Sequence, residues 1–346
     1  MTTRRVVAFG GGHGLSASLR ALRHCAPELD LDITAVVTVG DDGGSSGRLR
    51  AERGGLPPGD LRQALVALAG DHPATRRSAG LFQHRFAAAV AGVPEQGSGG
   101  SGPAVGDGPG DGGAARSDGL AGHAVGNLVL CGLMELLGDP VAALEHAGAM
   151  LGAVGRVLPM SRQPVGIEAQ VRGADPAAPD EVRTLRGQHQ VAVTTGRVEA
   201  LRLTPAAPAA CAEALAAIGA ADWLIFGPGS WYTSVLPHLL VPQLADAIVS
   251  SPARRLVTLN LAAEKETLGL SVADHLAALR WYLPELKVDL VLADAKAVGD
   301  PEPVERAAES LGARLVLAPV AVTDDTPRHD PVALGAALVP VLGADR

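Results

Sequence analysis

The chain has few cysteines, no long apolar run and no leader-like start, and each shortage excludes a class of protein. Its three cysteines, Cys25, Cys131 and Cys211, are far apart and form neither a C-x-x-C pair nor an even disulfide set, which favours a reducing compartment. No apolar stretch approaches the roughly 20 residues of a membrane helix, and the run after Met1–Arg5 is too short for a signal peptide. We therefore expect a cytoplasmic protein without a membrane segment.

Positive charge is also scarce. The 29 Lys and Arg residues are outnumbered by 37 Asp and Glu residues, so the net charge is -8. Such a balance argues against non-specific binding of nucleic acid or anionic membrane, because both need clustered basic residues. What the 346 residues do have is 47% hydrophobic content, enough for a large core. We expect one domain over residues 1–346, in a protein that forms a homo-oligomer.

Short apolar runs alternate with helix-like segments over most of the chain. This alternation predicts an α/β fold with a Rossmann-like, doubly wound and mainly parallel sheet. The expected strands are Val6–Phe9, Ile33–Val39, Trp223–Phe226, Leu256–Asn260, Val288–Asp294 and Arg314–Val320. The expected helices are Leu15–His24, Asp60–Ala69, Ser78–Val90, His123–Leu137, Pro140–Leu151, Pro208–Ile218, Pro237–Ser250, Ser271–Tyr282, Pro303–Leu311 and Pro331–Leu342.

Two stretches interrupt the alternation. Residues 94–119 are Gly, Ser, Pro and Asp with almost nothing apolar, which predicts a disordered insert because no burial offsets the entropy of ordering it. Residues 156–203 contain short β segments, Gly166–Val171, Gln190–Thr194 and Val198–Leu203, separated by turns. We expect the second stretch to form a small β-rich subdomain inserted into the α/β fold.

A glycine run, Gly10-Gly11-Gly12-His13-Gly14, joins the first expected strand to the first expected helix at Leu15. Such a run exposes backbone N–H groups at a helix N-terminus, where phosphate is favoured. It is not a complete dinucleotide fingerprint, because Leu15 stands where the third glycine would be. We interpret the run as one wall of a site for a nucleotide diphosphate, with no bound organic cofactor.

The second expected strand runs into a loop of carboxylates, glycines, hydroxyls and an arginine. Here Asp41 and Asp42 would hold Mg²⁺, Ser45 and Ser46 would meet phosphate oxygens, and Arg48 would make a bidentate contact. The alternative is a solvated turn in which the Asp side chains cap backbone amides.

Polar residues on two expected helices extend this candidate site. Asp60 follows Pro-Pro-Gly and is placed to cap its helix, and Arg62 lies one turn inside that helix. His123 and Asn127 stand one turn apart on another helix, which indicates contact with a ligand or with buried backbone. We do not expect zinc at His123, because no acidic or cysteine residue stands near it at ligand spacing.

A third loop follows the expected strand Trp223–Phe226. In it Gly227, Pro228 and Gly229 let the backbone approach a ligand, Ser230 and Thr233 can donate hydroxyls, and Tyr232 can stack; the alternative is a capped strand-to-helix turn. Because ligands of parallel sheets bind beyond the carboxyl ends of the strands, the three loops should converge on one crevice. Asn260 and Asp294 end two further strands and are expected on its rim.

These motifs resemble those of the gluconeogenesis-factor (YvcK-type) family, relatives of the 2-phospho-L-lactate transferases that build the deazaflavin coenzyme. The segments that carry the resemblance span most of the chain: GGGHGLSASLRAL, ITAVVTVGDDGGSSGRLR, LPPGDLRQALVALA, AGHAVGNLVL, GRVLP, ADWLIFGPGSWYTSVLPHLLVP and DHLAAL. The resemblance implies a Rossmann-like fold, a cytoplasmic location, a ligand such as UDP-N-acetylglucosamine, and a role in cell shape and envelope growth on gluconeogenic carbon.

The resemblance favours the regulator branch of this group. Transferases have a Pro-Asp-Leu-Asp-Thr run where this chain has Gly-Gly-Ser-Ser-Gly-Arg at 43–48 and Pro-Pro-Gly-Asp at 57–60. The chain departs from the family in three places: His13 replaces Thr, Trp231 replaces Leu, and residues 261–267 differ from Met-Thr-Gln-Pro-Gly-Glu-Thr.

Three hypotheses follow from the residues and the resemblance together. The first is a regulator that binds a UDP-sugar. The second is a Mg²⁺-dependent enzyme resembling the phospholactate transferase, in which Asp41 and Asp42 hold the metal on a diphosphate. The third, NAD-dependent redox chemistry, is disfavoured by the missing third glycine.

Overall fold

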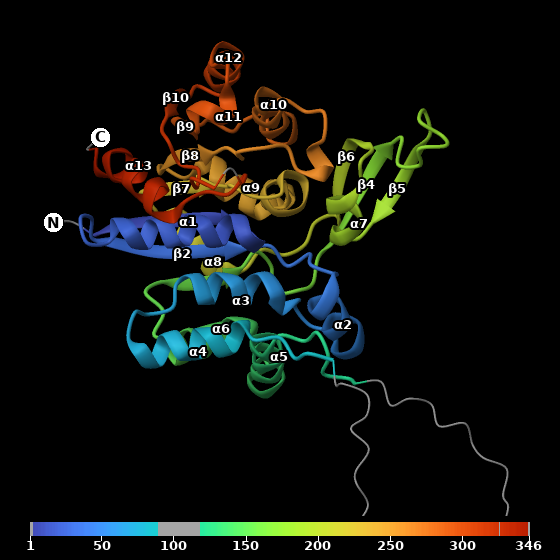
Figure 1. The fold of residues 1–346 in the computed structure, drawn as a ribbon, viewed down its shortest axis with the longest axis vertical. Coiled ribbons are helices and arrows are strands. Elements are labelled where there is room, and N and C mark those ends of the chain that lie inside the picture. The colour runs from blue at the N-terminus through green and yellow to red at the C-terminus, as the bar shows by residue number, and fades with distance from the viewer. Residues whose placement is uncertain (1–2, 89–117, 325, 345–346) are drawn as a thin grey trace, which may run out of the picture.

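A seven-stranded parallel sheet forms the centre of the protein (Figure 1). The computed structural model describes residues 3–88, 118–324 and 326–344. The strands of this sheet are β1 (Arg4–Gly10), β2 (Leu31–Val37), β3 (Arg156–Pro159), β7 (Trp223–Phe226), β8 (Arg254–Thr258), β9 (Leu290–Ala293) and β10 (Arg314–Leu317). They lie in the order β10-β9-β8-β7-β1-β2-β3, and every neighbouring pair is parallel.

The chain reverses its direction of travel across the sheet between β1 and β7. It adds β2 and β3 on one side of β1 and then adds β7 to β10 on the other side. Because crossovers between parallel strands are right-handed, the helices of the two halves cover opposite faces. The predicted doubly wound, Rossmann-like fold is confirmed, and its switch point is the gap beyond the carboxyl ends of β1 and β7.

Helices occupy most of the connections, and α13 returns from the end of the chain to pack on α1 (Figure 1). Their bounds are α1 (Gly12–Cys25), α2 (Gly44–Arg53), α3 (Pro58–Ala67), α4 (Pro73–Gln83), α5 (Val125–Leu137), α6 (Pro140–Leu151), α7 (Gln188–Val193), α8 (Ala212–Ala220), α9 (Pro242–Ser250), α10 (Val272–Tyr282), α11 (Ala295–Val298), α12 (Glu302–Ser310) and α13 (Pro331–Gly343), with short turns η1 (Trp231–Val235), η2 (Leu236–Leu240) and η3 (Lys265–Thr267). Among these described helices, none has the length and apolar character needed to cross a bilayer.

The core lies on both faces of the central strands, where apolar residues are continuous rather than alternating. In β1 every residue from Val6 to Gly10 is buried, as expected for a strand covered by helices on both sides. The rings of Phe9 in β1 and Phe226 in β7 stack with centroids 4.8 Å apart. This contact joins the two strands just before the loops that carry the candidate site.

A small antiparallel sheet projects from the main body beside α7 (Figure 1). It consists of β4 (Gly166–Arg172), β5 (Val182–Arg186) and β6 (Arg197–Thr204). The expected start of the subdomain at Arg156 is wrong, because β3 pairs with β2 in the central sheet. The expected strand Gln190–Thr194 is also wrong: these residues belong mainly to α7, where the Val191 amide donates to the Gly187 carbonyl.

Three further expectations need correction. The expected helix Ser78–Val90 ends at Gln83, because His84 is extended and Arg85 forms a bridge with Ala124. The loop expected after β2 becomes helical at Gly44, and the expected helix from Pro237 is split at Val241, before Pro242. Of the expected insert at 94–119, all but residues 118 and 119 lie outside the described residues.

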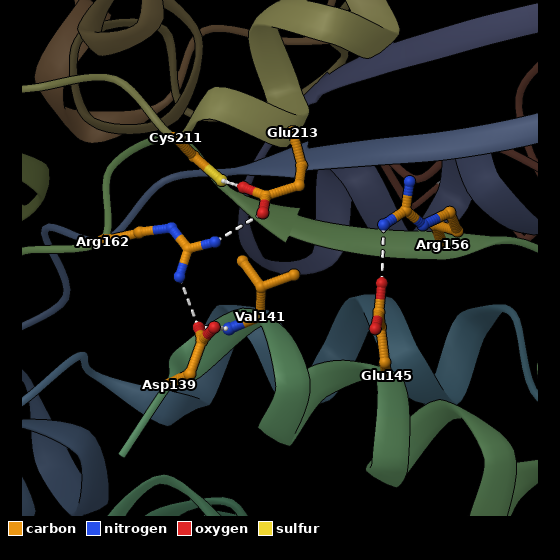
Figure 2. Close-up of polar contacts among 7 residues, drawn as sticks. All are labelled: Asp139, Val141, Glu145, Arg156, Arg162, Cys211 and Glu213. Carbon is orange, nitrogen blue, oxygen red and sulfur yellow. Dashed lines mark hydrogen bonds and ion pairs between the residues drawn. The ribbon is translucent and has the colours of Figure 1, made fainter. Parts of the chain in front are cut away.

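Charged contacts connect α6 to α8 at the side of the molecule shown in Figure 2. Asp139 caps α6 by accepting a hydrogen bond from the Val141 amide at 2.9 Å. The Arg162 guanidinium donates both to Asp139 and to Glu213 of α8. Because Arg162 and Asp139 are 36% and 42% exposed, solvent screens the ion pair and the cap carries more of the stability.

We expect Asp139→Ala to lower the free energy of unfolding by about 1 to 2 kcal/mol, because it removes the cap of α6 and one partner of Arg162. Asp139→Asn keeps a capping oxygen and should lose less than about 1 kcal/mol. Urea denaturation of the two variants measures the difference. Equal losses would show that the charge of Asp139, rather than its cap, stabilises this region.

Candidate functional site

A cleft of about 960 Å³ opens at the switch point of the sheet. Its walls come from the loop after β1, the loop after β7, the loop after β8, helix α3 and the loop before α13. Many of the residues predicted from the sequence line it: Gly11, Gly12, His13, Gly14, Arg62, Pro228, Gly229, Ser230, Thr233 and Asn260. The structure therefore brings two of the three predicted loops together on one crevice.

The loops after β1 and β7 touch through their backbones. A Cβ added at Gly14 would lie 2.2 Å from the Pro228 carbonyl oxygen, so no larger residue fits there without moving the loop. Asn260 holds the second loop from the other side: its Oδ1 accepts from the Gly229 amide at 2.8 Å and its Nδ2 donates to the Gly229 carbonyl at 2.9 Å. Asn260 thus positions this wall of the cleft.

The N-terminus of α1 faces the cleft without a side-chain cap. Gly11 is its N-cap residue and has no side chain with which to occupy the first-turn amides. A Cβ at Gly11 would lie 2.4 Å from Asp60 Oδ2 and 2.5 Å from Thr38 Oγ1, which explains why glycine is required. The amides of His13 and Gly14 are therefore placed where an anion is favoured.

Asp60 does not have the capping role predicted from the sequence. It does not cap α3; its side chain accepts hydrogen bonds from Thr38 Oγ1 at 3.1 Å and from the Gly12 amide, and it lines the cleft. Burial, with the nearby Asp41 carboxylate adding to it, raises the pKa of Asp60 from 3.8 to about 7. A carboxyl group that titrates near neutrality thus lies beside the helix N-terminus.

Arg62 is a buried cation at the cleft wall. It is 3% exposed, and its hydrogen bonds go to amide oxygens: Nε donates to Asn127 Oδ1 at 2.8 Å, and Nη1 donates to Gln83 Oε1. Burial lowers the pKa of Arg62 to about 10, so it remains charged at neutral pH. The Asp60 and Asp41 carboxylates favour its charge from a distance, but within the described chain neither forms an ion pair with it.

The predicted pair His123 and Asn127 lies behind Arg62 rather than in the cleft lining. Asn127 Nδ2 donates to Ser45 Oγ at 2.9 Å, and Ser45 Oγ lies 3.0 Å from His123 Nδ1. Burial lowers the pKa of His123, so the ring is neutral at pH 7 and its Nδ1 can accept the Ser45 hydroxyl hydrogen. Through Asn127, these residues hold the Arg62 guanidinium in place without lining the cleft themselves.

The residues predicted around a metal are separated by the structure. Asp41 caps the Gly43 amide at 3.0 Å and faces Gly59 beside Ser46, whereas Asp42 accepts from the His189 amide at 2.8 Å in α7. Arg48 is exposed and donates to the Ala121 carbonyl. Over the described ranges, no cluster of three or more His, Cys, Asp or Glu side chains is arranged for a metal.

Other predicted residues lie next to the cleft without lining it. Gly10 and Leu15 are buried in the core around β1, and Gly227 accepts from Ser18 Oγ. The Tyr232 ring is buried, with its pKa raised to about 12 by that burial, so it is not placed for stacking. Asp294 is not on the rim, because it caps α11 and accepts from the Val320 and Ala321 amides.

Several cleft residues were absent from the sequence-based prediction. They are Arg20, Gln83, Arg85, Glu264, Arg328 and His329. Arginines outnumber carboxylates among the described residues of the lining, although the whole chain is acidic. Arg20 could have been predicted, because it lies seven residues after His13 and therefore on the same face of α1. Arg85 and Arg328 could not, because they come from loops whose position no local pattern indicates.

Comparison with known proteins agrees with this architecture. The family model described as 2-phospho-L-lactate transferase CofD matches residues 6–319. The chain is 47% identical to a Mycobacterium tuberculosis protein that provisionally bears the name gluconeogenesis factor, covering 99% of this chain and 92% of that protein. It is 33% identical to the Bacillus subtilis gluconeogenesis factor, over 90% and 84% of the two chains. A crystal structure of a UPF0052 family member from Bacillus halodurans superposes with a TM-score of 0.78 at 32% identity, covering 98% of this chain and 100% of that one.

The fold and the cleft define a doubly wound α/β protein with a cationic crevice at its topological switch point. Within that class, the chain belongs to the CofD family, in the group whose named members are gluconeogenesis factors.

Asp60 should make the stability of the protein depend on pH. Because its pKa rises from 3.8 to about 7 on folding, the folded protein holds a proton that the unfolded chain releases in this window, and the free energy of unfolding falls as pH rises through it. We expect Asp60→Asn to raise the free energy of unfolding at pH 8 by on the order of 2 kcal/mol, and to change it much less near pH 4.

Urea denaturation of the ligand-free protein at pH 4 and pH 8 measures this difference. Asp42→Asn is the control, because Asp42 is exposed and bonds only the His189 amide. Burial also raises the pKa of Glu266 to about 7. Glu266 therefore makes the free energy of unfolding fall with pH in the same way, and this contribution is present in both variants. An equal effect of Asp60→Asn at both pH values would contradict the assignment.

Proposed function

We propose that the protein is a gluconeogenesis factor that binds a nucleotide diphosphate, in the form of a UDP-sugar, in the switch-point cleft. The observation that carries this proposal is Arg62, a guanidinium that is 3% exposed and bonded to neutral amides only. Asp60 and Asp41 partly stabilise this charge, but burial remains the larger effect, and among the described residues no carboxylate supplies a counter-charge in direct ion-pair contact. A phosphate bound at the cleft wall would supply that counter-charge and accept the remaining guanidinium N–H groups.

The diphosphate would lie between Arg62 and the first turn of α1. The uncapped amides of His13 and Gly14 supply donors there, and the macrodipole of the 14-residue helix favours negative charge at the same point. Arg20, Arg85 and Arg328 line the remaining cleft and would attract an anionic ligand. The volume of about 960 Å³ leaves room for groups attached to the diphosphate.

We propose that Mg²⁺ would be held by a different pair of carboxylates from the one predicted. Asp41 and Asp60 are the carboxylates that lie close enough for one to raise the pKa of the other, while Asp42 is directed to α7. Mg²⁺ is held by one or two protein carboxylates together with substrate phosphates, so Asp41 and Asp60 would suffice. When bound, the ion would neutralise charge on the diphosphate.

The biological role follows from the relatives rather than from the cleft. The similarity to proteins named gluconeogenesis factor supports a role in gluconeogenesis. From the resemblance of the motifs to the YvcK-type family, we further propose a cytoplasmic regulator of cell shape and envelope growth on gluconeogenic carbon. In this role the bound nucleotide sugar would report the supply of envelope precursors.

The second candidate function is a transferase of the 2-phospho-L-lactate type. The family model named for that enzyme and the Asp41–Asp60 pair beside the helix N-terminus favour it. Its catalysis would consist of positioning and charge stabilisation on a phosphoryl group. Two measurements separate the two: calorimetric titration with UDP-sugars, and incubation of the deazaflavin and Mg²⁺ with a nucleotide-activated phospholactate, from which the acceptor hydroxyl would displace the nucleoside monophosphate. Saturable UDP-sugar binding without turnover supports the regulator, and product formation from the deazaflavin would overturn it.

We expect Arg62→Met to weaken UDP and pyrophosphate binding by about 10- to 100-fold, since a charged hydrogen bond to phosphate contributes about 1.5 to 3 kcal/mol. Isothermal titration calorimetry measures the loss. Arg48→Ala is the matched control, because Arg48 is an exposed arginine bonded to the Ala121 carbonyl and absent from the cleft lining. The same loss in both variants, or in neither, would contradict the proposed placement of the phosphate.

Mg²⁺ should strengthen UDP binding through Asp41 and Asp60. Removing Mg²⁺ with a chelator should weaken UDP binding to the wild type, whereas Asp41→Asn should bind UDP equally with and without Mg²⁺. Asp42→Asn should keep the Mg²⁺ dependence, because that carboxylate is bonded to the His189 amide. A dependence lost in both Asp41→Asn and Asp42→Asn would support the metal site predicted from the sequence, and one kept in Asp41→Asn would contradict the assignment to Asp41 and Asp60.

A further inference from the structure

Glu264 is a carboxylate in the cleft lining, and its negative charge would repel an anionic group in direct contact with it. It lies in the loop after β8, is partly buried and lines the cleft. Its Oε2 accepts a hydrogen bond from Ser230 Oγ, and its side chain also accepts from the Thr267 amide in the capping box of η3. Within the described chain it forms no ion pair with an Arg, Lys or His side chain.

The position of Glu264 is tied to the proposed phosphate site. Its partner Ser230 follows Gly229 directly, and Gly229 approaches Gly14 in the first turn of α1, where a Cβ at Gly229 would lie 3.6 Å from the Gly14 Cα. A ligand group that reaches Glu264 is therefore one attached next to the phosphate. A second phosphate is excluded there by like charge.

The chemistry of the carboxylate defines what this neighbouring group is. An ionised carboxylate accepts hydrogen bonds at about four lone-pair positions, and the structure gives two of its donors, Ser230 and Thr267. It therefore needs a ligand that donates hydrogens and carries no negative charge. The hydroxyl groups of a sugar esterified to the phosphate are donors of this kind.

We propose that Glu264 accepts hydrogen bonds from hydroxyl groups of the sugar attached to the bound phosphate and thereby selects nucleotide sugars or ribonucleotides over bare phosphates. This assignment rests on the proposed diphosphate site. Two sugars share the chemistry, the ribose and the hexose of a UDP-sugar, and both are attached directly to phosphate. The hydrogen bond from Ser230 Oγ holds the carboxylate in place at the cleft wall.

The test uses Glu264→Gln in the full chain, with calorimetry on four ligands: pyrophosphate, 2′,3′-dideoxyuridine diphosphate, UDP and UDP-glucose. Glutamine keeps the size of the side chain and one acceptor but removes the charge and places an NH₂ donor against the hydroxyls. We expect UDP-glucose to bind about tenfold more weakly, while pyrophosphate binds as before or more tightly because a like charge has been removed. Loss of affinity for one ligand together with gain for another is a result that general damage to the fold does not produce.

Glu285→Gln is the matched control, because Glu285 is exposed, lies outside the cleft lining and undergoes the same change of charge. If Glu264→Gln loses affinity for UDP-glucose but not for UDP, Glu264 binds hydroxyl groups of the hexose. A loss seen with both ligands and absent with the dideoxy nucleotide supports the assignment through the ribose.

Two results would be contrary. If Glu264→Gln binds all four ligands as the wild type does, or loses the same factor with every one, Glu264 does not recognise a sugar, although the phosphate site stands. If the wild type binds neither pyrophosphate nor UDP, the proposed function itself fails, and the assignment of Glu264 fails with it.

Discussion

The cleft depends on one backbone contact, the approach of Gly14 to the Pro228 carbonyl. A Cβ at Gly14 would come within 2.2 Å of that oxygen, so the two loops can meet only where a side chain is missing. The contact lies between the ends of β1 and β7, where the chain changes its direction across the sheet. It fixes the N-terminus of α1 against the second loop, and Asn260 holds that loop from the outer side. Backbone donors are thus set in place before any ligand arrives.

Around this contact the described lining of the cleft has more arginines than carboxylates. Arg62 is buried but bonded to amides, and Asp60, its nearest acidic neighbour on α3, is held with a raised pKa beside Asp41. Arg62 and Asp60 each favour the charged form of the other, but burial remains the largest effect on both pKa values. A phosphate bound in the cleft, as proposed, would add a direct counter-charge for Arg62 and stabilise the folded protein.

How far the sequence predicts this site depends on whether the pattern is local. The glycine run, the expected β7 loop and the convergence of strand ends could be predicted, because strand-to-helix turns and parallel topology have local signatures. The role of Asp60 could not, since a helix-start carboxylate has the same local pattern whether it caps its own helix or faces α1. The separate roles of Asp41 and Asp42 could not be predicted either. Asp42 accepts its hydrogen bond from His189 of α7, a helix that lies far along the chain and has no local signature near Asp42. The prediction of a strand at Gln190–Thr194 was wrong because the local pattern was too short. Alternation of apolar residues over five positions does not distinguish a strand from a short helix.

The central claim is that the diphosphate of a nucleotide binds between the first turn of α1 and Arg62. A crystal structure of the protein with UDP tests it most directly. We expect a phosphate oxygen within hydrogen-bond distance of the His13 or Gly14 amide and a second one on the Arg62 guanidinium. A diphosphate bound at Arg48 and Asp42, away from α1, would contradict it.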